Sequence, residues 1–248
     1  MSLTVVSQTH FLYIGSGYSF SLKDGVDDDT YGSITAKGEG YGQVTFKDAR
    51  PRIAEGFNYF LGYNYGFKDR WGINAEIAYL DGIAWRRKVY NQFNSYEWFT
   101  TESESYWARV SVNYTWNAKK NYTRRDGFKE RIHGTLAIGP SIFKATVIND
   151  YTSSDGTPED RFFHLRYYHF ENVGYGVHGR LGIGYQIGKN VVVNISVRAE
   201  YASYTTDAFR QTINRVGAAE QPEVIRHGNN TKYSFNNITP SLSLAYTF

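Results

Sequence analysis

The last residues of the chain, from Ile238 to Phe248, alternate without a break between apolar and small polar side chains. Successive side chains of a β-strand point to opposite faces, so this segment has one apolar face and one polar face. The apolar face carries Ile238, Pro240, Leu242, Leu244, Tyr246 and Phe248. The alternation predicts a strand over 238–248 that separates an apolar environment from a polar one.

The composition favours β-structure along the whole chain of 248 residues, which includes 22 Tyr, 16 Phe and 24 Gly. Aromatic residues are enriched in strands. The absence of Cys excludes disulfides and thiolate ligands. The mean hydropathy of −0.50 is polar, but a membrane barrel needs apolar residues only at every second position. The net charge of +3 is nearly balanced and does not indicate a nucleic-acid partner.

Alternation with a period of two recurs upstream, most clearly in 55–67. The further predicted strands are 9–22, 55–67, 71–85, 105–117, 131–148, 170–187 and 190–205. With the terminal strand these make eight. The long polar links 23–54, 86–104, 149–169 and 206–232 alternate with the short links 68–70, 118–130 and 188–189. This alternation indicates an even number of antiparallel strands with short turns at one end and long loops at the other. We expect residues 1–248 to form a single all-β domain.

The aromatic last residue, the alternation before it and the asymmetry of the links resemble small bacterial outer-membrane β-barrels of the OmpA/OmpX or opacity type. The resemblance implies an antiparallel up-and-down transmembrane β-barrel with eight strands in the bacterial outer membrane. It also implies that Tyr246 and Phe248 belong to an assembly signal read by the barrel assembly machinery. Outer-membrane lipid and lipopolysaccharide would be the other partners. Residues 1–6 contain no signal peptide, and we expect the sequence to be a mature form.

Five charged residues fall on the polar faces of the predicted strands, with His178 nearby. They are Glu76, Arg109, Arg180, Arg198 and Glu200. The interior of an eight-stranded barrel is only just wide enough for its own side chains. Charges in such an interior must be paired and hydrogen-bonded, because an unpaired buried charge is very costly. We therefore predict a paired lumen network that plugs the barrel, with a gate or a proton path as the alternative role.

A short basic run, Arg86-Arg87-Lys88, follows the third predicted strand at the outer rim. Anionic lipid head groups lie at that level, so a phosphate contact is one interpretation. The other interpretation is an ordinary solvated start of a loop.

The resemblance implies a non-enzymatic protein whose long extracellular loops serve surface recognition, adhesion or membrane integrity. Three alternatives stay open: a narrow pore for ions or small solutes, a lipid A-modifying enzyme, and a soluble ligand-binding barrel of the lipocalin kind. The soluble barrel requires the Tyr- and Phe-rich faces to point inward. The histidines are His10, His133, His164, His169, His178 and His227. None stands in a His-x-Ser pattern on an apolar face or in zinc-ligand spacing, so we expect no catalytic residue, cofactor or metal.

Overall fold

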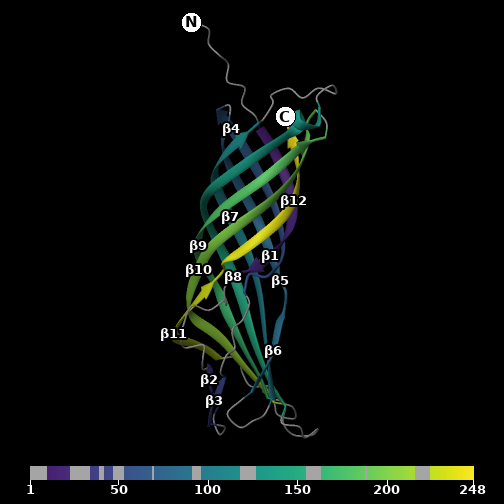
Figure 1. The fold of residues 1–248 in the computed structure, drawn as a ribbon. Coiled ribbons are helices and arrows are strands. Elements are labelled where there is room, and N and C mark those ends of the chain that lie inside the picture. Colours follow the sequence, from purple (N-terminus) through teal and green to yellow (C-terminus); the bar gives the residue numbers. More distant parts are fainter. Residues whose placement is uncertain are drawn as a thin grey trace.

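The computed structural model is a closed antiparallel β-barrel (Figure 1). It describes residues 10–22, 34–38, 42–46, 53–68, 70–90, 96–117, 127–154, 163–187, 189–215 and 224–248. Eight strands form the wall in the order in which they occur in the chain. They are β1 (His10–Ser21), β4 (Gly56–Lys68), β5 (Trp71–Gly82), β7 (Tyr96–Trp116), β8 (Ile132–Ser154), β9 (Phe163–Gln186), β10 (Val191–Arg215) and β12 (Asn237–Thr247). The barrel closes because β1 pairs with both β4 and β12.

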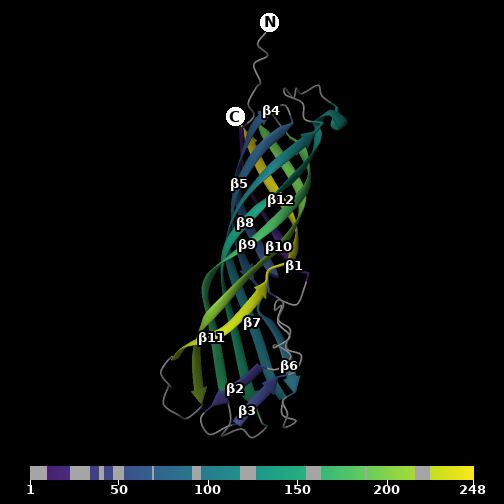
Figure 2. The ribbon, with the colours of Figure 1, turned by 90° about the vertical axis from the view of Figure 1, so that its left-hand side faces the viewer.

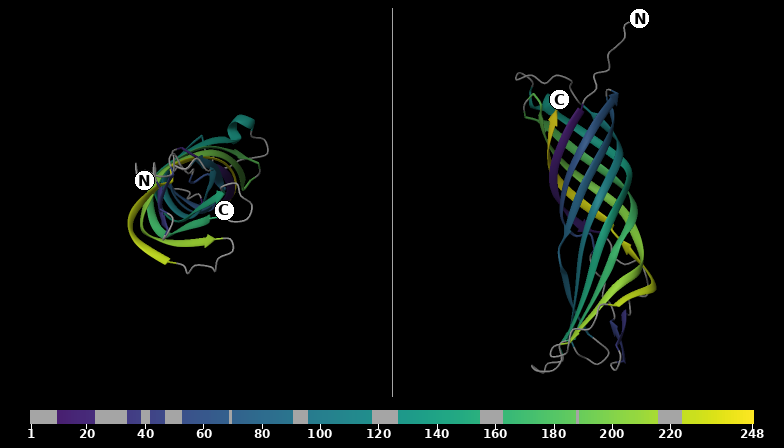
Figure 3. Two further views of the ribbon diagram at one scale, coloured as in Figure 1. Left: turned by 90° about the horizontal axis from the view of Figure 1, so that it is seen from below. Right: turned by 180° about the vertical axis from the view of Figure 1, so that it is seen from behind.

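The remaining strands lie at one end of the barrel (Figure 2). β6 (Trp85–Tyr90) continues the line of β5 and pairs with β7, and β11 (Val224–Ser234) precedes β12 and pairs with β10. β2 (Ile34–Gly38) and β3 (Gly42–Phe46) form a hairpin. A 3-10 turn, η2 (Phe128–Arg131), precedes β8 at the other end. The C-terminus and the short links lie at that other end (Figures 1 and 3), which we call the periplasmic end; the opposite end is the outer end.

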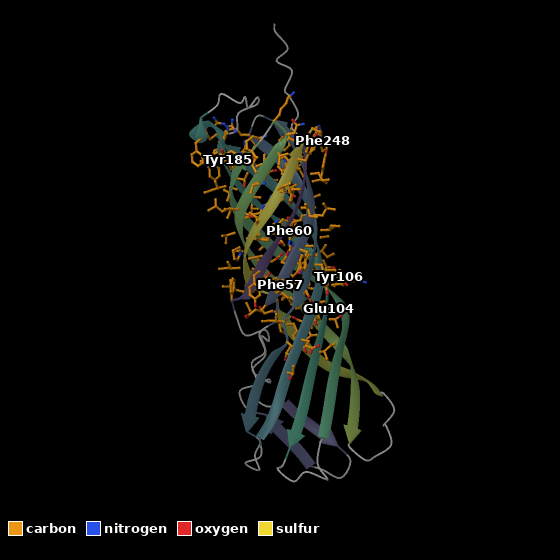
Figure 4. All side chains as sticks on the ribbon, turned by 90° about the vertical axis from the view of Figure 1, so that its right-hand side faces the viewer. Phe57, Phe60, Glu104, Tyr106, Tyr185 and Phe248 are labelled. Atoms are coloured by element: carbon orange, nitrogen blue, oxygen red, sulfur yellow. The ribbon has the colours of Figure 1, made fainter. Side chains whose placement is uncertain are left out.

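The apolar face of every wall strand points outward. Leu61, Val112, Ile183 and Leu244 are all exposed, with Leu181 exposed to 57%. Figure 4 shows such side chains projecting around the whole upper part of the wall. A continuous apolar exterior is stable only in lipid, so the predicted lipid-facing side is confirmed and the soluble lipocalin-like alternative is wrong.

Among the described residues, no helix is long and apolar enough to cross a membrane.

Two sets of outward-pointing aromatic side chains bound the apolar exterior. Figure 4 places Tyr185 and Phe248 near the periplasmic end and Phe57 and Tyr106 nearer the outer end. On β9, Tyr175 and Tyr185 are ten residues apart, which is about 33 Å along the strand and roughly 25 Å along the axis of a barrel with strands tilted by about 40°. That height matches the apolar band of an outer-membrane barrel, so the two aromatic sets mark the two membrane interfaces.

The predicted long loops are largely wrong, because the strands continue far beyond the outer aromatic set. β7 begins at Tyr96, β8 ends at Ser154, β9 begins at Phe163 and β10 ends at Arg215. Much of the predicted links 86–104, 149–169 and 206–232 is therefore strand. Beyond the membrane both faces of a strand meet polar surroundings, so the apolar alternation fades although the backbone pairing continues. We call the part of the wall beyond the outer aromatic set, which includes β6, β11 and the outer ends of β7 to β10, the projecting wall.

We expect the lipid-facing side to respond to charge according to depth. Leu181→Arg, near the middle of the apolar band, should destabilise the folded barrel by about 2–4 kcal/mol, and Ile187→Arg at the periplasmic interface by about 0–1 kcal/mol. Urea unfolding of the two variants in phospholipid vesicles measures this. Equal costs at both sites would contradict the placement of the membrane.

Candidate functional site

The lumen contains a buried cluster of charged side chains built around Glu76 on β5. Nη1 of Arg109 donates to Oε1 of Glu76 over 3.1 Å, and Nη2 of Arg198 donates to Oε2 over 2.6 Å. Glu76 lies directly opposite Arg109 in the pairing of β5 with β7. Arg198 reaches the same carboxylate from β10, across the barrel. Glu76 therefore links wall strands that are not neighbours.

The second carboxylate, Glu200 on β10, binds Arg109 through two hydrogen bonds. Nε donates to Oε1 over 3.1 Å and Nη2 donates to Oε2 over 2.7 Å. The side chains of Arg109, Glu76 and Glu200 are exposed by no more than 3%. Such a bidentate guanidinium–carboxylate pair is the strongest geometry available to these groups. Arg109 thus joins the two carboxylates into one network.

Arg180 on β9 binds at the edge of the network. Its Nη1 lies 3.4 Å from Oε2 of Glu76 and 3.3 Å from the hydroxyl of Tyr13 on β1. That hydroxyl also lies 2.9 Å from Oε2 of Glu76 and 2.8 Å from Oδ1 of Asn74. The structure therefore brings together all five residues predicted for the lumen, and adds Tyr13, which sequence reasoning missed. We call Glu76, Arg109, Arg180, Arg198, Glu200 and Tyr13 the charge network.

A layer of inward aromatic side chains fills the lumen on the outer side of the charge network. It consists of Trp107, Phe143, Tyr204, Tyr233 and Phe235, each exposed by no more than 3%. The rings of Trp107 and Phe143 stack with centroids 4.1 Å apart, and Phe235 lies 4.9 Å from Phe143. The guanidinium of Arg109 lies 4.8 Å from the centroid of Trp107, so the aromatic layer rests directly on the charge network. This layer was not predicted from the sequence.

Glycines on neighbouring strands make room for the inward rings. Gly62 lies opposite Tyr13 in the pairing of β1 with β4, and a Cβ there would lie 2.2 Å from the Tyr13 ring. Gly174 lies opposite Phe143, and a Cβ there would lie 2.3 Å from that ring. In a narrow barrel, an aromatic residue with a glycine directly across from it therefore indicates an inward ring once the register of the strands is known.

The predicted assembly residues lie at the periplasmic rim beside the seam that closes the barrel. The ring of Phe248 stacks on that of His10 with centroids 6.1 Å apart, and its N–H donates to the carbonyl of His10 over 3.1 Å. Nδ1 of His10 lies 2.6 Å from the hydroxyl of Tyr63 on β4. Asn190 donates to the hydroxyl of Tyr246 over 3.2 Å. The C-terminal residues therefore contact both the first strand and the turn before β10.

The basic run Arg86-Arg87-Lys88 is not the start of a loop, because its backbone belongs to β6 and pairs with residues 98–100 of β7. Its side chains lie outside the described part of the structure, and so do those of His164, His169 and His227. Within the described residues, no group of three or more His, Cys, Asp or Glu side chains is placed to hold a metal ion.

Comparison with known proteins finds similarity at the level of solved structures. No protein-family model matches the sequence, and no curated protein is similar to it. Neisserial surface protein A is similar with a TM-score of 0.44, 11% identity and 97% of each chain covered. OprG of Pseudomonas aeruginosa has a TM-score of 0.45 and 13% identity over 98% of this chain and 97% of its own. A major outer membrane protein of Thermus thermophilus has a TM-score of 0.49 and 11% identity over 98% of this chain and all of its own.

The closed even-numbered barrel, its apolar exterior and its two aromatic sets make this chain an integral β-barrel of the bacterial outer membrane.

Removing a carboxylate of the charge network should be strongly destabilising. Glu76→Gln leaves three guanidiniums around a neutral amide in a narrow interior, and we expect a loss of about 3–5 kcal/mol in the free energy of unfolding. Glu102→Gln, which changes an exposed carboxylate of β7, is the matched control and should have little effect. The measurement is urea unfolding in vesicles, and equal behaviour of the two variants would contradict a stabilising network.

Deleting Phe248 should act on both assembly and stability. The resemblance predicts slower insertion into the outer membrane of cells. The stacking on His10 predicts a further loss of roughly 0.5–1.5 kcal/mol in the finished barrel. Pulse-labelled insertion in cells and urea unfolding of protein refolded without assembly factors separate the two effects. Insertion at the normal rate would refute the assembly role, and unchanged unfolding would refute the stabilising one.

Proposed function

We propose that this protein is a non-enzymatic, non-conducting outer-membrane barrel whose projecting wall acts in recognition or adhesion at the cell surface. The observation that carries the proposal is the combination of a filled lumen with strands that continue well past the membrane. From Tyr201 to Arg215, β10 runs for fourteen residues beyond the outer aromatic set, or roughly 45 Å along the strand. A structural role in membrane integrity needs no such extension.

Packing in the lumen argues against the narrow-pore alternative. The charge network and the aromatic layer lie one above the other. Within the aromatic layer, the ring centroids of Trp107, Phe143 and Phe235 lie 4.1 to 6.2 Å apart. Open aqueous channels occur in barrels with many more strands. Transport would require the aromatic layer and the charge network to move together, with unpaired charges exposed to a poorly hydrated interior.

The positions of the described histidines argue against the lipid-modifying alternative. His10 lies at the periplasmic rim, bonded to Tyr63, whereas His133 and His178 point into the lumen. None of these three lies on the lipid-facing side near the outer end, where a base acting on lipid A would have to lie. The proposal therefore places the activity of the protein in its outer surface rather than in a catalytic group.

The outward side of the projecting wall carries acidic residues just beyond the membrane. Asp81 on β5 lies directly opposite Glu104 on β7, and Glu102 follows on the same face. Like charges opposite one another destabilise a sheet. Their exposed carboxylates at the base of the projecting wall support a role in contact with another surface, such as a basic region of a partner protein.

The proposal is tested in two experiments on the full-length protein. In planar bilayers, we expect no steady single-channel current; a large current would refute the filled lumen. In cells that display the protein, binding to immobilised host-matrix proteins should fall when Glu102→Lys and Glu104→Lys are introduced together. Lys189→Glu at the periplasmic end is the control with a reversed charge and should bind like the wild type. Absence of any binding by wild-type cells would refute the recognition role.

A further inference from the structure

The charge network divides the lumen into an outer half and a periplasmic half. The inward side chains of these halves differ in their exposed fraction. In the outer half burial is complete or nearly so, with Leu80 and Ser105 exposed by 0%. In the periplasmic half several inward residues keep an intermediate exposure: Phe11, His133, Thr135, Asn194 and Ser241. These side chains point away from the lipid, so their exposed surface lies inside the barrel. The lumen on the periplasmic side of the charge network is therefore filled less completely than on the outer side, and we call this part the periplasmic pit.

The periplasmic pit contains buried polar atoms that have no hydrogen-bond partner among the described residues. They include Oδ1 of Asn64 and Oδ1 of Asn113. Both side chains gather over Gly72, where a Cβ would lie 2.8 Å from Oδ1 of Asn113 and 3.2 Å from Nδ2 of Asn64. Buried amide oxygens of this kind bind water in a polar space. The periplasmic pit is thus lined by polar groups.

The charge network at the end of the pit carries more positive than negative charge. Three guanidiniums face two carboxylates, Glu76 and Glu200. Arg109 and Arg198 take the short contacts to those carboxylates, at 2.6 to 3.1 Å, whereas Arg180 approaches Glu76 only to 3.4 Å. The side chain of Arg180 is exposed to 15%, against 3% or less for the other network charges. Arg180 is therefore the surplus cation, and it faces the pit.

We propose that the periplasmic pit binds a small inorganic anion, such as chloride, on the guanidinium of Arg180. A guanidinium has five N–H donors, and the hydrogen bonds of Arg180 to described residues all use Nη1. Nε and Nη2 remain for a further acceptor. An anion there neutralises a charge that is otherwise costly to bury. The narrow interior admits halides and excludes large organic anions. This inference is independent of the proposed recognition role.

The first test compares unfolding rates in sodium chloride and in sodium gluconate at equal ionic strength. Folded wild-type protein in detergent should unfold about tenfold more slowly at a chloride concentration of about ten times its Kd. Arg180→Gln should still fold, because it leaves two guanidiniums against two carboxylates, and its unfolding should not depend on the anion. Lys189→Gln removes one positive charge from the exposed periplasmic turn and should keep the full dependence.

The second test locates the ion. Crystals of the wild-type protein grown with bromide should show an anomalous scattering peak beside Arg180, and crystals of Arg180→Gln should not. A chloride dependence that persists in Arg180→Gln, a wild type insensitive to chloride, or bromide peaks confined to the protein surface would each overturn the proposal.

Discussion

The narrowness of an eight-stranded barrel is the constraint on which the rest of the structure depends. Every inward side chain must fit against the opposite wall, and every inward charge must find a partner there. The charge network meets both demands, because Glu76 contacts guanidiniums from β7, β9 and β10 while Tyr13 adds a contact from β1. These contacts run across the barrel, whereas backbone hydrogen bonds connect only neighbours. The network therefore fixes the cross-section as well as the register of the wall.

A network of this kind stabilises the barrel only when all of its contacts are formed. Each guanidinium and carboxylate loses its hydration on entering the lumen, and a partly formed set leaves unpaired charge in a poorly hydrated space. The bidentate pair of Arg109 with Glu200 requires β7 and β10 to have reached their final positions on opposite sides of the barrel. A slip of one residue would place Arg109 on the lipid side, because it exchanges the two faces of the strand, and a slip of two would move Arg109 away from its carboxylates. The network thus opposes misregistered barrels more strongly than an apolar lumen would.

The two halves of the lumen solve the same packing problem in different ways. On the outer side, large rings are accommodated by glycines across from them, as Phe143 is by Gly174. On the periplasmic side most inward residues other than Phe11 are small or polar, and the side chain of Arg180 keeps 15% of its surface exposed. The charge network lies at the boundary, where Arg109 contacts Trp107 on the outer side and Arg180 faces the periplasmic pit. This asymmetry explains how a surplus cation is tolerated in an otherwise filled interior.

The sequence predicts the membrane-spanning part of the fold well, because lipid on one side and a polar lumen on the other impose strict alternation. Strands at 55–67 and 238–248 were therefore predicted within one residue of β4 and β12 at each end. The lumen charges were predictable as a set, since each interrupts an otherwise small polar face. The inward rings were not, because an aromatic residue is equally common on the lipid side, and only the cross-strand register shows that Phe143 faces Gly174. The projecting wall was missed for the opposite reason, since no lipid imposes a pattern there.

That difference in constraint also bears on function. Substitutions on the lipid-facing side are limited by hydrophobicity, and substitutions in the lumen are limited by volume and charge pairing. The projecting wall is held together by backbone pairing that continues from the barrel. Most of its outward positions are therefore limited neither by contact with lipid nor by packing in the lumen. Glu102 and Glu104 lie where this freedom begins, one beyond the other on β7, past Tyr106 at the membrane interface. Outward positions of the projecting wall are therefore limited mainly by neighbouring side chains across the sheet, as at its base, where the like charges of Asp81 and Glu104 lie directly opposite each other.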